Sequence, residues 1–243
     1  MRVLDYLRSR LAEGKVHLSL LDPEKLTPKE AGEVAFRATL AGTDGIMVGG
    51  STGVTPDATD ATVKAIKDRT RVPVVLFPSG AHTLSRYADA VFFMSMLNSR
   101  DLRMIVGEQK RAAPAIKAWG LETIPMGYLI VEPGMRVGEV GAAKPIPRDD
   151  PEEAVRYALT AQFLGMQLVY LEAGSGAPEP VPPKMISAVR AEISIPLVVG
   201  GGIRTAEAAR TTAASGADIV VTGTVIEEDQ ARLQAIVDAV KGL

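Results

Sequence analysis

The sequence contains no cysteine, which excludes disulfide bonds and thiolate-ligated metal sites and fits a reducing compartment. Histidine is almost as scarce. His17 and His82 are isolated from each other and from any metal-ligand partner at suitable spacing, so both are expected to be structural. Aromatic residues make up only 5% of the chain and form no stacking array. We therefore expect a protein of the cytoplasm that uses neither disulfides nor a histidine metal site.

Charge and hydropathy exclude two further classes of protein. The formal net charge is −2 at pH 7, so nothing indicates a nucleic-acid-binding surface. No apolar run approaches the ~20 residues needed to cross a bilayer. Residues 3–13 follow an amphipathic helical pattern with charges throughout, which is not the pattern of a signal peptide. At most a peripheral membrane contact is expected.

The chain is long enough, and apolar enough, to form one large core. It has 243 residues, of which 47% are hydrophobic, and a (β/α)8 barrel of about 250 residues is normal. Short runs rich in β-branched residues alternate with helical patterns, and no break in composition divides residues 1–243. We expect strands at 17–21, 45–48, 72–77, 90–95, 123–131, 168–171, 195–199 and 219–222. This order predicts a single-domain TIM barrel, with an open doubly wound sheet as the alternative.

Two connections between these strands have unusual lengths. Only about a dozen residues separate the third and fourth predicted strands, too few for a crossover helix with its turns, so the helix there should be shortened or missing. A long helix is expected at 100–118. Residues 132–150 then form a long glycine- and proline-rich loop, and loops of that length inside a compact domain are usually functional.

Glycine turns follow the last two predicted strands. The run 195–204 ends in Gly200, Gly201 and Gly202 before a helical pattern, and the run 219–224 ends in Gly223 and Thr224. Glycine permits positive φ and a close approach of the backbone to a ligand, and the helix that follows directs free N–H groups at the turn. Phosphate commonly binds after strands seven and eight of such barrels. The alternative is that the glycines only make tight turns.

Polar residues at other strand ends complete the predicted site. Asp22 and Ser51 follow neighbouring strands, and one carboxylate with one hydroxyl suits Mg²⁺, which keeps waters and takes phosphate oxygens as further ligands. Alternatively, Asp22 only caps the helix after it. Tyr170 and Glu172 lie two apart on one strand and point the same way. Glu172 can bind the hydroxyls of a polyol, and Ser175 can bind a phosphate. A structural ion pair of Glu172 is the alternative.

Together these motifs resemble the geranylgeranylglyceryl phosphate synthase family, which includes the bacterial heptaprenylglyceryl phosphate synthases. The resemblance spans nearly the whole chain and is carried in order by Leu21-Asp-Pro-Glu-Lys25, Val48-Gly-Gly-Ser51, Phe77-Pro-Ser-Gly80, Tyr170-Leu-Glu-Ala-Gly-Ser-Gly176, Val199-Gly-Gly-Gly202 and Thr222-Gly-Thr224. The barrel of that family lacks the helix after its third strand, which agrees with the short connection described above.

The resemblance implies an Mg²⁺-dependent prenyltransferase. It would join geranylgeranyl diphosphate to the 3-hydroxyl of sn-glycerol 1-phosphate, forming the first ether bond of archaeal membrane lipids and releasing diphosphate. Asp22 and Ser51 would hold Mg²⁺, and Glu172 would be catalytic. The residues implied to bind glycerol phosphate are Tyr170, Leu171, Glu172, Ala173, Gly174, Ser175, Gly176, Gly201, Gly202, Gly223 and Thr224.

Several alternatives stay open at the level of sequence. The prenyl chain length is not determined, and a phosphate-binding barrel isomerase or a non-catalytic phosphate-binding barrel would use similar glycine turns. The resemblance also implies a homo-oligomer, either a dimer or a hexamer. Many members of the family carry an aromatic residue where this chain has Glu139, and a carboxylate is costly to bury without a partner. We therefore expect a dimer.

Overall fold

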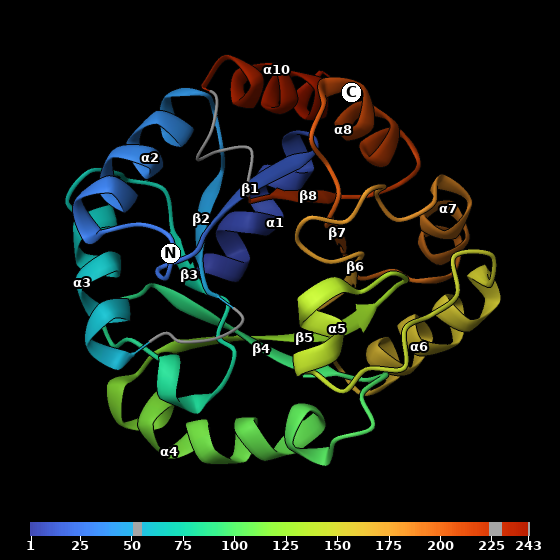
Figure 1. The fold of residues 1–243 in the computed structure, drawn as a ribbon, viewed down its shortest axis with the longest axis horizontal. Coiled ribbons are helices and arrows are strands. Elements are labelled where there is room, and N and C mark those ends of the chain that lie inside the picture. Colours follow the sequence, from blue (N-terminus) through green and yellow to red (C-terminus); the bar gives the residue numbers. More distant parts are fainter. Residues whose placement is uncertain (51–54, 224–229, 243) are drawn as a thin grey trace.

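The computed structural model describes residues 1–50, 55–223 and 230–242, and its strands form one closed barrel (Figure 1). All neighbouring strands are parallel, and β8 closes the barrel on β1 through pairs such as Leu18 with Val221. The strands are β1 (Val16–Leu21), β2 (Gly45–Val48), β3 (Val74–Leu76), β4 (Ala90–Met96), β5 (Glu122–Ile130), β6 (Leu168–Glu172), β7 (Leu197–Gly200) and β8 (Ile219–Thr222). The predicted TIM barrel is confirmed, and the open sheet is excluded.

Helices surround this barrel, and their first turns explain where they begin. Thr27 forms a capping box with Glu30, and Asp150 accepts a hydrogen bond from Glu153 N at 3.0 Å. In both cases proline follows the capping residue, where it costs no hydrogen bond. The surrounding helices are α2 (Pro28–Leu40), α3 (Pro56–Lys67), α4 (Glu108–Trp119), α6 (Pro151–Phe163), α7 (Pro183–Glu192), α8 (Ala206–Ala214) and α10 (Gln230–Lys241).

Helix α1 (Val3–Glu13) closes the end of the barrel at which the strands begin. Its apolar face, including Leu4 and Leu7, packs with side chains of the barrel interior. The carboxylate of Glu122, at the start of β5, accepts hydrogen bonds from Val3 N at 2.7 Å and Leu4 N at 3.0 Å. These bonds satisfy two of the free N–H groups at the start of the helix. With this end closed, access to the interior is from the carboxyl ends of the strands.

The connection between β3 and β4 lacks an α-helix, as predicted. Its only regular element is a single 3-10 turn, η1 (Ala81–Thr83). The turn is fixed to the neighbouring helix α4, because Ala81 N donates a 2.8 Å hydrogen bond to the carboxylate of Glu108. No crossover helix therefore covers β3 and β4 on this side, and α4 is the next helix in the ring (Figure 1).

Two predicted elements differ from the structure. The long helix expected at 100–118 begins as a π-helix, η2 (Arg103–Gly107), and continues as α4. The loop expected at 132–150 contains a short helix, α5 (Met135–Val140). Gly138 inside the helix argues against it by propensity, but Gly141, the C-cap, permits close packing: a Cβ there would lie 2.3 Å from Met96 Cε. Tertiary packing thus outweighs local preference here.

No helix among the described residues is long and apolar enough to span a membrane.

Candidate active site

Two cavities meet at the carboxyl ends of the strands. The larger encloses about 1260 Å³, counted out to open solvent, and the smaller about 440 Å³. Both are lined by Leu20, Glu172, Ser175 and Gly223, so they adjoin each other. The smaller cavity lies over β6, β7 and β8, and the larger extends over β3 and β4. A ligand with two chemically different parts can occupy both at once.

The smaller cavity contains the glycine turns predicted to bind phosphate. Gly201 and Gly202 have φ angles of +84° and +72°, in the left-handed region that favours glycine. A Cβ at Gly202 would lie 2.6 Å from the carbonyl of Glu179, so a side chain would also collide with the loop above. Gly223 lines the cavity from β8, and Thr224 lies outside the described residues. Helix α8 begins directly after the β7 turn, with Thr205 as its N-cap.

Tyr170 and Glu172 both line the smaller cavity, as their spacing on one strand predicts. The Tyr170 hydroxyl is buried and has no hydrogen-bond partner at ordinary distance among the described residues. A buried hydroxyl without a partner costs free energy, which a ligand oxygen in this cavity would recover. Glu172 is only 5% exposed, and its Oε1 accepts a 2.7 Å hydrogen bond from Gly174 N. The other carboxylate oxygen remains for a ligand hydroxyl.

Burial raises the pKa of Glu172 above its ordinary value. The N–H of Gly174 opposes this rise most strongly, and the hydroxyls of Tyr170 and Tyr128, which are near the carboxylate but beyond ordinary hydrogen-bond distance, oppose it as polar neighbours. Tyr128 stands beside Tyr170 in the register of β5 and β6, and its ring centroid lies 5.2 Å from that of Tyr170. The sequence analysis did not single out Tyr128. The strand that carries it was predicted to neighbour the strand of Tyr170 and Glu172, and this could have indicated its place in the site. A carboxylate with a raised pKa is a better proton acceptor near neutral pH.

The other residues of the predicted glycerol phosphate motif divide into two groups. Leu171 and Ala173 are fully buried in the outer core between barrel and helices, and their side chains line neither cavity. Ser175 and Gly176 are exposed and line the smaller cavity. Gly174 has a φ of +100°, and a Cβ there would lie 2.7 Å from Gly134 O. Leu171 and Ala173 can therefore contribute through their backbone only.

Asp22 stands at the entrance of the larger cavity, where it was expected to hold a metal. Its Oδ1 accepts a 3.0 Å hydrogen bond from Glu24 N, and a Cβ at Gly50 would lie only 2.3 Å from the same oxygen. Burial raises the pKa of Asp22, while Glu24 N–H and the Lys25 ammonium lower it. The predicted partner Ser51 lies outside the described residues.

The donor set around Asp22 fits Mg²⁺ better than a metal held by protein alone. Among the described residues, no group of three or more histidines and carboxylates converges on a metal position. A single half-buried carboxylate with space beside it is a site that Mg²⁺ completes with waters and phosphate oxygens. Lys25 lines the same part of the cavity and adds a positive charge there. An anionic ligand group would be held at this point.

The rest of the larger cavity is an apolar channel over β3 and β4. It lies where the missing crossover helix leaves these strands uncovered, and α4 forms its far wall. The channel is lined by Phe77, Leu84, Phe92, Phe93, Met94, Met96, Met104, Ala112 and Ile116. Methionine adapts its shape readily, which suits a wall that contacts a flexible hydrocarbon. Sequence reasoning did not single out these residues, because apolar side chains of a channel and of a core follow the same pattern.

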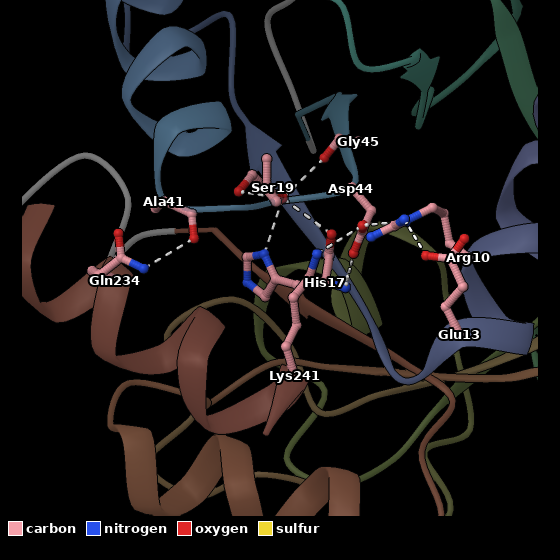
Figure 2. Close-up of polar contacts among 10 residues, drawn as sticks. Arg10, Glu13, His17, Ser19, Ala41, Asp44, Gly45, Gln234 and Lys241 are labelled. Atoms are coloured by element: carbon pink, nitrogen blue, oxygen red, sulfur yellow. Dashed lines mark hydrogen bonds and ion pairs between the residues drawn. The ribbon is translucent and has the colours of Figure 1, made fainter. Parts of the chain in front are cut away.

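His17 belongs to a polar cluster outside both cavities (Figure 2). Its ring nitrogens lie 3.0 Å from Thr43 Oγ1 and 2.9 Å from Thr222 Oγ1, and the ring is fully buried. Asp44 accepts a hydrogen bond from His17 N and forms an ion pair with Lys241 of α10 at 2.8 Å. Burial lowers the pKa of His17 to about 4, so the ring is neutral at physiological pH. These contacts are structural, as expected for this histidine.

The glycine turns at Gly201, Gly202 and Gly223 line the smaller cavity, which we call the anion cup. A closed (β/α)8 barrel with such a cup beside an apolar channel is typical of phosphate-binding barrel enzymes that act on a partly apolar substrate. The model of the PcrB family matches residues 8–241, and the chain belongs to this family.

Its relatives are geranylgeranylglyceryl phosphate synthases. That of Thermococcus gammatolerans is 54% identical over 93% of this chain and 90% of its own. That of Methanothermobacter marburgensis is 51% identical over 100% and 99% of the two chains. The crystal structure of (S)-3-O-geranylgeranylglyceryl phosphate synthase from Thermoplasma acidophilum, in complex with substrate sn-glycerol 1-phosphate, has a TM-score of 0.97 with 47% identity and covers 100% of both chains. The resemblance stated from the motifs is confirmed.

Proposed function

We propose that this protein is a geranylgeranylglyceryl phosphate synthase, which transfers the geranylgeranyl group from its diphosphate to the 3-hydroxyl of sn-glycerol 1-phosphate. The observation that carries the proposal is that the two cavities adjoin each other at Glu172 and Gly223, which line both. The glycine cup suits the phosphate of the acceptor, and the apolar channel suits the prenyl chain of the donor. The names of the relatives, at about half identity over the full chain, support the same reaction.

Glu172 performs the proton chemistry in this proposal. The carbon–oxygen bond between the prenyl group and diphosphate breaks with its electron pair leaving on diphosphate, and the glycerol 3-oxygen forms a new bond to the same carbon. The proton of that hydroxyl passes to the carboxylate of Glu172, whose raised pKa favours acceptance. Tyr170 and Tyr128 lie beside this carboxylate, which the Gly174 N–H holds through a hydrogen bond to its Oε1.

The diphosphate end of the donor lies near Asp22 and Lys25. We assign Mg²⁺ to Asp22 and to Ser51, which lies outside the described residues; when bound, the ion stabilises the charge that develops on the leaving diphosphate. Lys25 contributes a fixed positive charge at the same place. The apolar walls of the channel exclude water from the allylic cation, which would otherwise react with it.

The site is less suited to an isomerase. Such enzymes need paired acid and base groups around the reacting carbon. Among the described residues that line the smaller cavity, Glu172 is the only carboxylate. Asp22, Lys25 and Glu108 line the neighbouring cavity, but most of its walls are apolar side chains. A geranylgeranyl donor is proposed over other chain lengths because the relatives carry that name.

The kinetic test of this assignment uses Glu172→Gln, which keeps the size of the side chain but removes its charge. Loss of the proton acceptor is expected to lower kcat, and loss of its charge-assisted hydrogen bond is expected to raise the KM for glycerol phosphate by roughly ten- to a hundredfold. The KM for geranylgeranyl diphosphate should stay close to that of the wild type. Equal damage to both substrates would assign Glu172 a structural role instead.

We propose a homodimer as the assembly. Several large apolar side chains are exposed on the single chain, among them Phe163 (79%) and Leu164 (65%), which adjoin one another at the end of α6. Glu139, in α5, is highly exposed, and its nearest cation is Arg136 at 3.8 Å. Burying this carboxylate in a second, larger interface would cost free energy, which disfavours a hexamer.

A further inference from the structure

Two arginines from different loops hold the loop that follows β6. Arg204, after the β7 glycine turn, donates from Nη2 to Gly176 O at 2.7 Å. Arg148, before α6, donates from Nη2 to Pro180 O at 2.9 Å and to the carboxylate of Glu179 at 3.0 Å. The loop at 173–181, which carries Ser175 over the anion cup, is therefore fixed from two sides.

The two arginines differ in their relation to the smaller cavity. Arg204 lines this cavity, whereas Arg148 lines neither cavity. Of the described residues around the smaller cavity, Arg204 is the sole cationic side chain, and Glu172 is the sole carboxylate. The glycine N–H groups are uncharged, so a phosphate in the cup would meet one negative charge and one positive charge. Arg204 supplies the positive one.

The bond to Gly176 uses only part of the hydrogen-bonding capacity of Arg204. A guanidinium has five N–H donors in a planar fork that matches the oxygens of a phosphate. One hydrogen bond from this side chain, to Gly176 O, is found among the described residues. The same side chain can therefore hold the loop with one nitrogen and bind an anion with others.

We propose that Arg204 is the residue that makes this site specific for a phosphorylated acceptor. It places the 174–176 turn over the cup through Gly176 O and binds the phosphate with its remaining donors. This assignment rests on the proposed function, because the phosphate is that of the glycerol phosphate acceptor. It adds to the glycine turns a charged side chain with a direct role in acceptor affinity.

The test compares Arg204→Met and Arg204→Lys with two control variants. Arg148→Met removes the other arginine of the same loop, and Arg210→Met removes an exposed arginine of α8. Binding of sn-glycerol 1-phosphate and of inorganic phosphate is measured by titration calorimetry, so the readout does not depend on turnover. Thermal unfolding of each variant checks that it is folded.

Arg204→Met is expected to weaken binding of both anions by roughly ten- to a hundredfold. Arg204→Lys should recover part of the loss, because it keeps the charge but not the fork. Arg148→Met should cause a smaller loss, and Arg210→Met none. In the transfer reaction, Arg204→Met should raise the KM for glycerol phosphate and leave the KM for the prenyl donor unchanged.

Two results would overturn the inference. If Arg204→Met binds both anions as the wild type does, the arginine has no role in phosphate binding. If Arg148→Met and Arg204→Met weaken binding equally, Arg204 acts only through the loop. Failure of the proposed function has a different signature: the wild type would bind glycerol phosphate, with the predicted dependence on Arg204, but transfer no prenyl group.

Discussion

Gly200 lies so close to Tyr170 that a Cβ at position 200 would be 2.2 Å from the tyrosine hydroxyl. Tyr170 cannot easily move away, because it is fully buried and its ring packs against those of Phe77 and Tyr128. Gly200, the first of the three glycines at 200–202, is thus required by the side chain of Tyr170. In the register of β6 and β7, Gly200 pairs with Glu172 and Tyr170 pairs with Val198, so Tyr170 and Gly200 are diagonal neighbours on adjacent strands.

This contact predicts that Gly200→Ala destabilises the protein by about 1–3 kcal/mol, as overpacking of a core typically does. The free energy of unfolding from urea titration measures it. The double variant Tyr170→Phe with Gly200→Ala should recover part of the loss, because the nearest atom is then gone and the next ring carbons lie at 3.1 Å. Strictly additive effects of the two substitutions would show that the two residues are not coupled.

Asp22→Asn tests the assignment of Mg²⁺. The substitution should lower kcat by roughly a hundredfold or more, because it removes the carboxylate that we assign to Mg²⁺. The fold should be unaffected, since the side chain makes only a local bond to Glu24 N. Asp68→Asn, at the exposed end of α3, is the matched control. Near wild-type turnover of Asp22→Asn in saturating Mg²⁺ would contradict the assignment.

His17 makes stability depend on pH. Its pKa is about 4 in the folded protein against an ordinary value of 6.5, so the unfolded chain binds the proton more tightly. The neutral, buried ring of His17 therefore contributes its full stabilisation to the folded protein above pH 6.5, and this contribution is lost as the pH falls toward 4. Between pH 7 and pH 5 the expected loss is about 2 kcal/mol.

The measurement is urea unfolding at both pH values for the wild type and for His17→Gln. Asp22 and Glu172 have raised pKa values and shift stability in the opposite direction, but they do so equally in both proteins. The difference between wild type and variant isolates the histidine. An identical change in both proteins would mean that His17 does not titrate as its burial indicates.

Light scattering at micromolar concentration tests the proposed assembly. A mass near two chains is expected. A mass near six chains would show that the exposed carboxylate of Glu139 does not prevent the larger assembly, and the mass of one chain would remove the oligomer altogether.

The sequence predicted the barrel because each strand is a short, β-branched run buried on both faces, and such runs have few alternative environments. It also predicted that Asp22, Tyr170, Glu172 and the glycine turns gather at one end, since all of them follow parallel strands. It did not predict α5, because Gly138 inside this helix and the glycines at both of its caps, Gly134 and Gly141, are typical of a loop. The apolar channel was also missed as a set of residues.

The channel exists because no α-helix lies among the described residues between β3 and β4, and the residue types of its walls do not reveal this. Phe77, Met96 and Ile116 come from separate elements, and nothing in their local pattern distinguishes a channel wall from a core. Tyr128 and Arg204 were missed for a related reason. Their roles follow from the strand register and from a loop contact, neither of which local sequence specifies.

The transfer of label from glycerol phosphate into lipid tests the central claim most directly. Purified protein is incubated with Mg²⁺, geranylgeranyl diphosphate and labelled sn-glycerol 1-phosphate, and the products are partitioned between water and organic solvent. Label is expected to enter the organic phase as a prenyl ether, with release of diphosphate. It would be contradicted if all label stays in water while the protein binds both substrates.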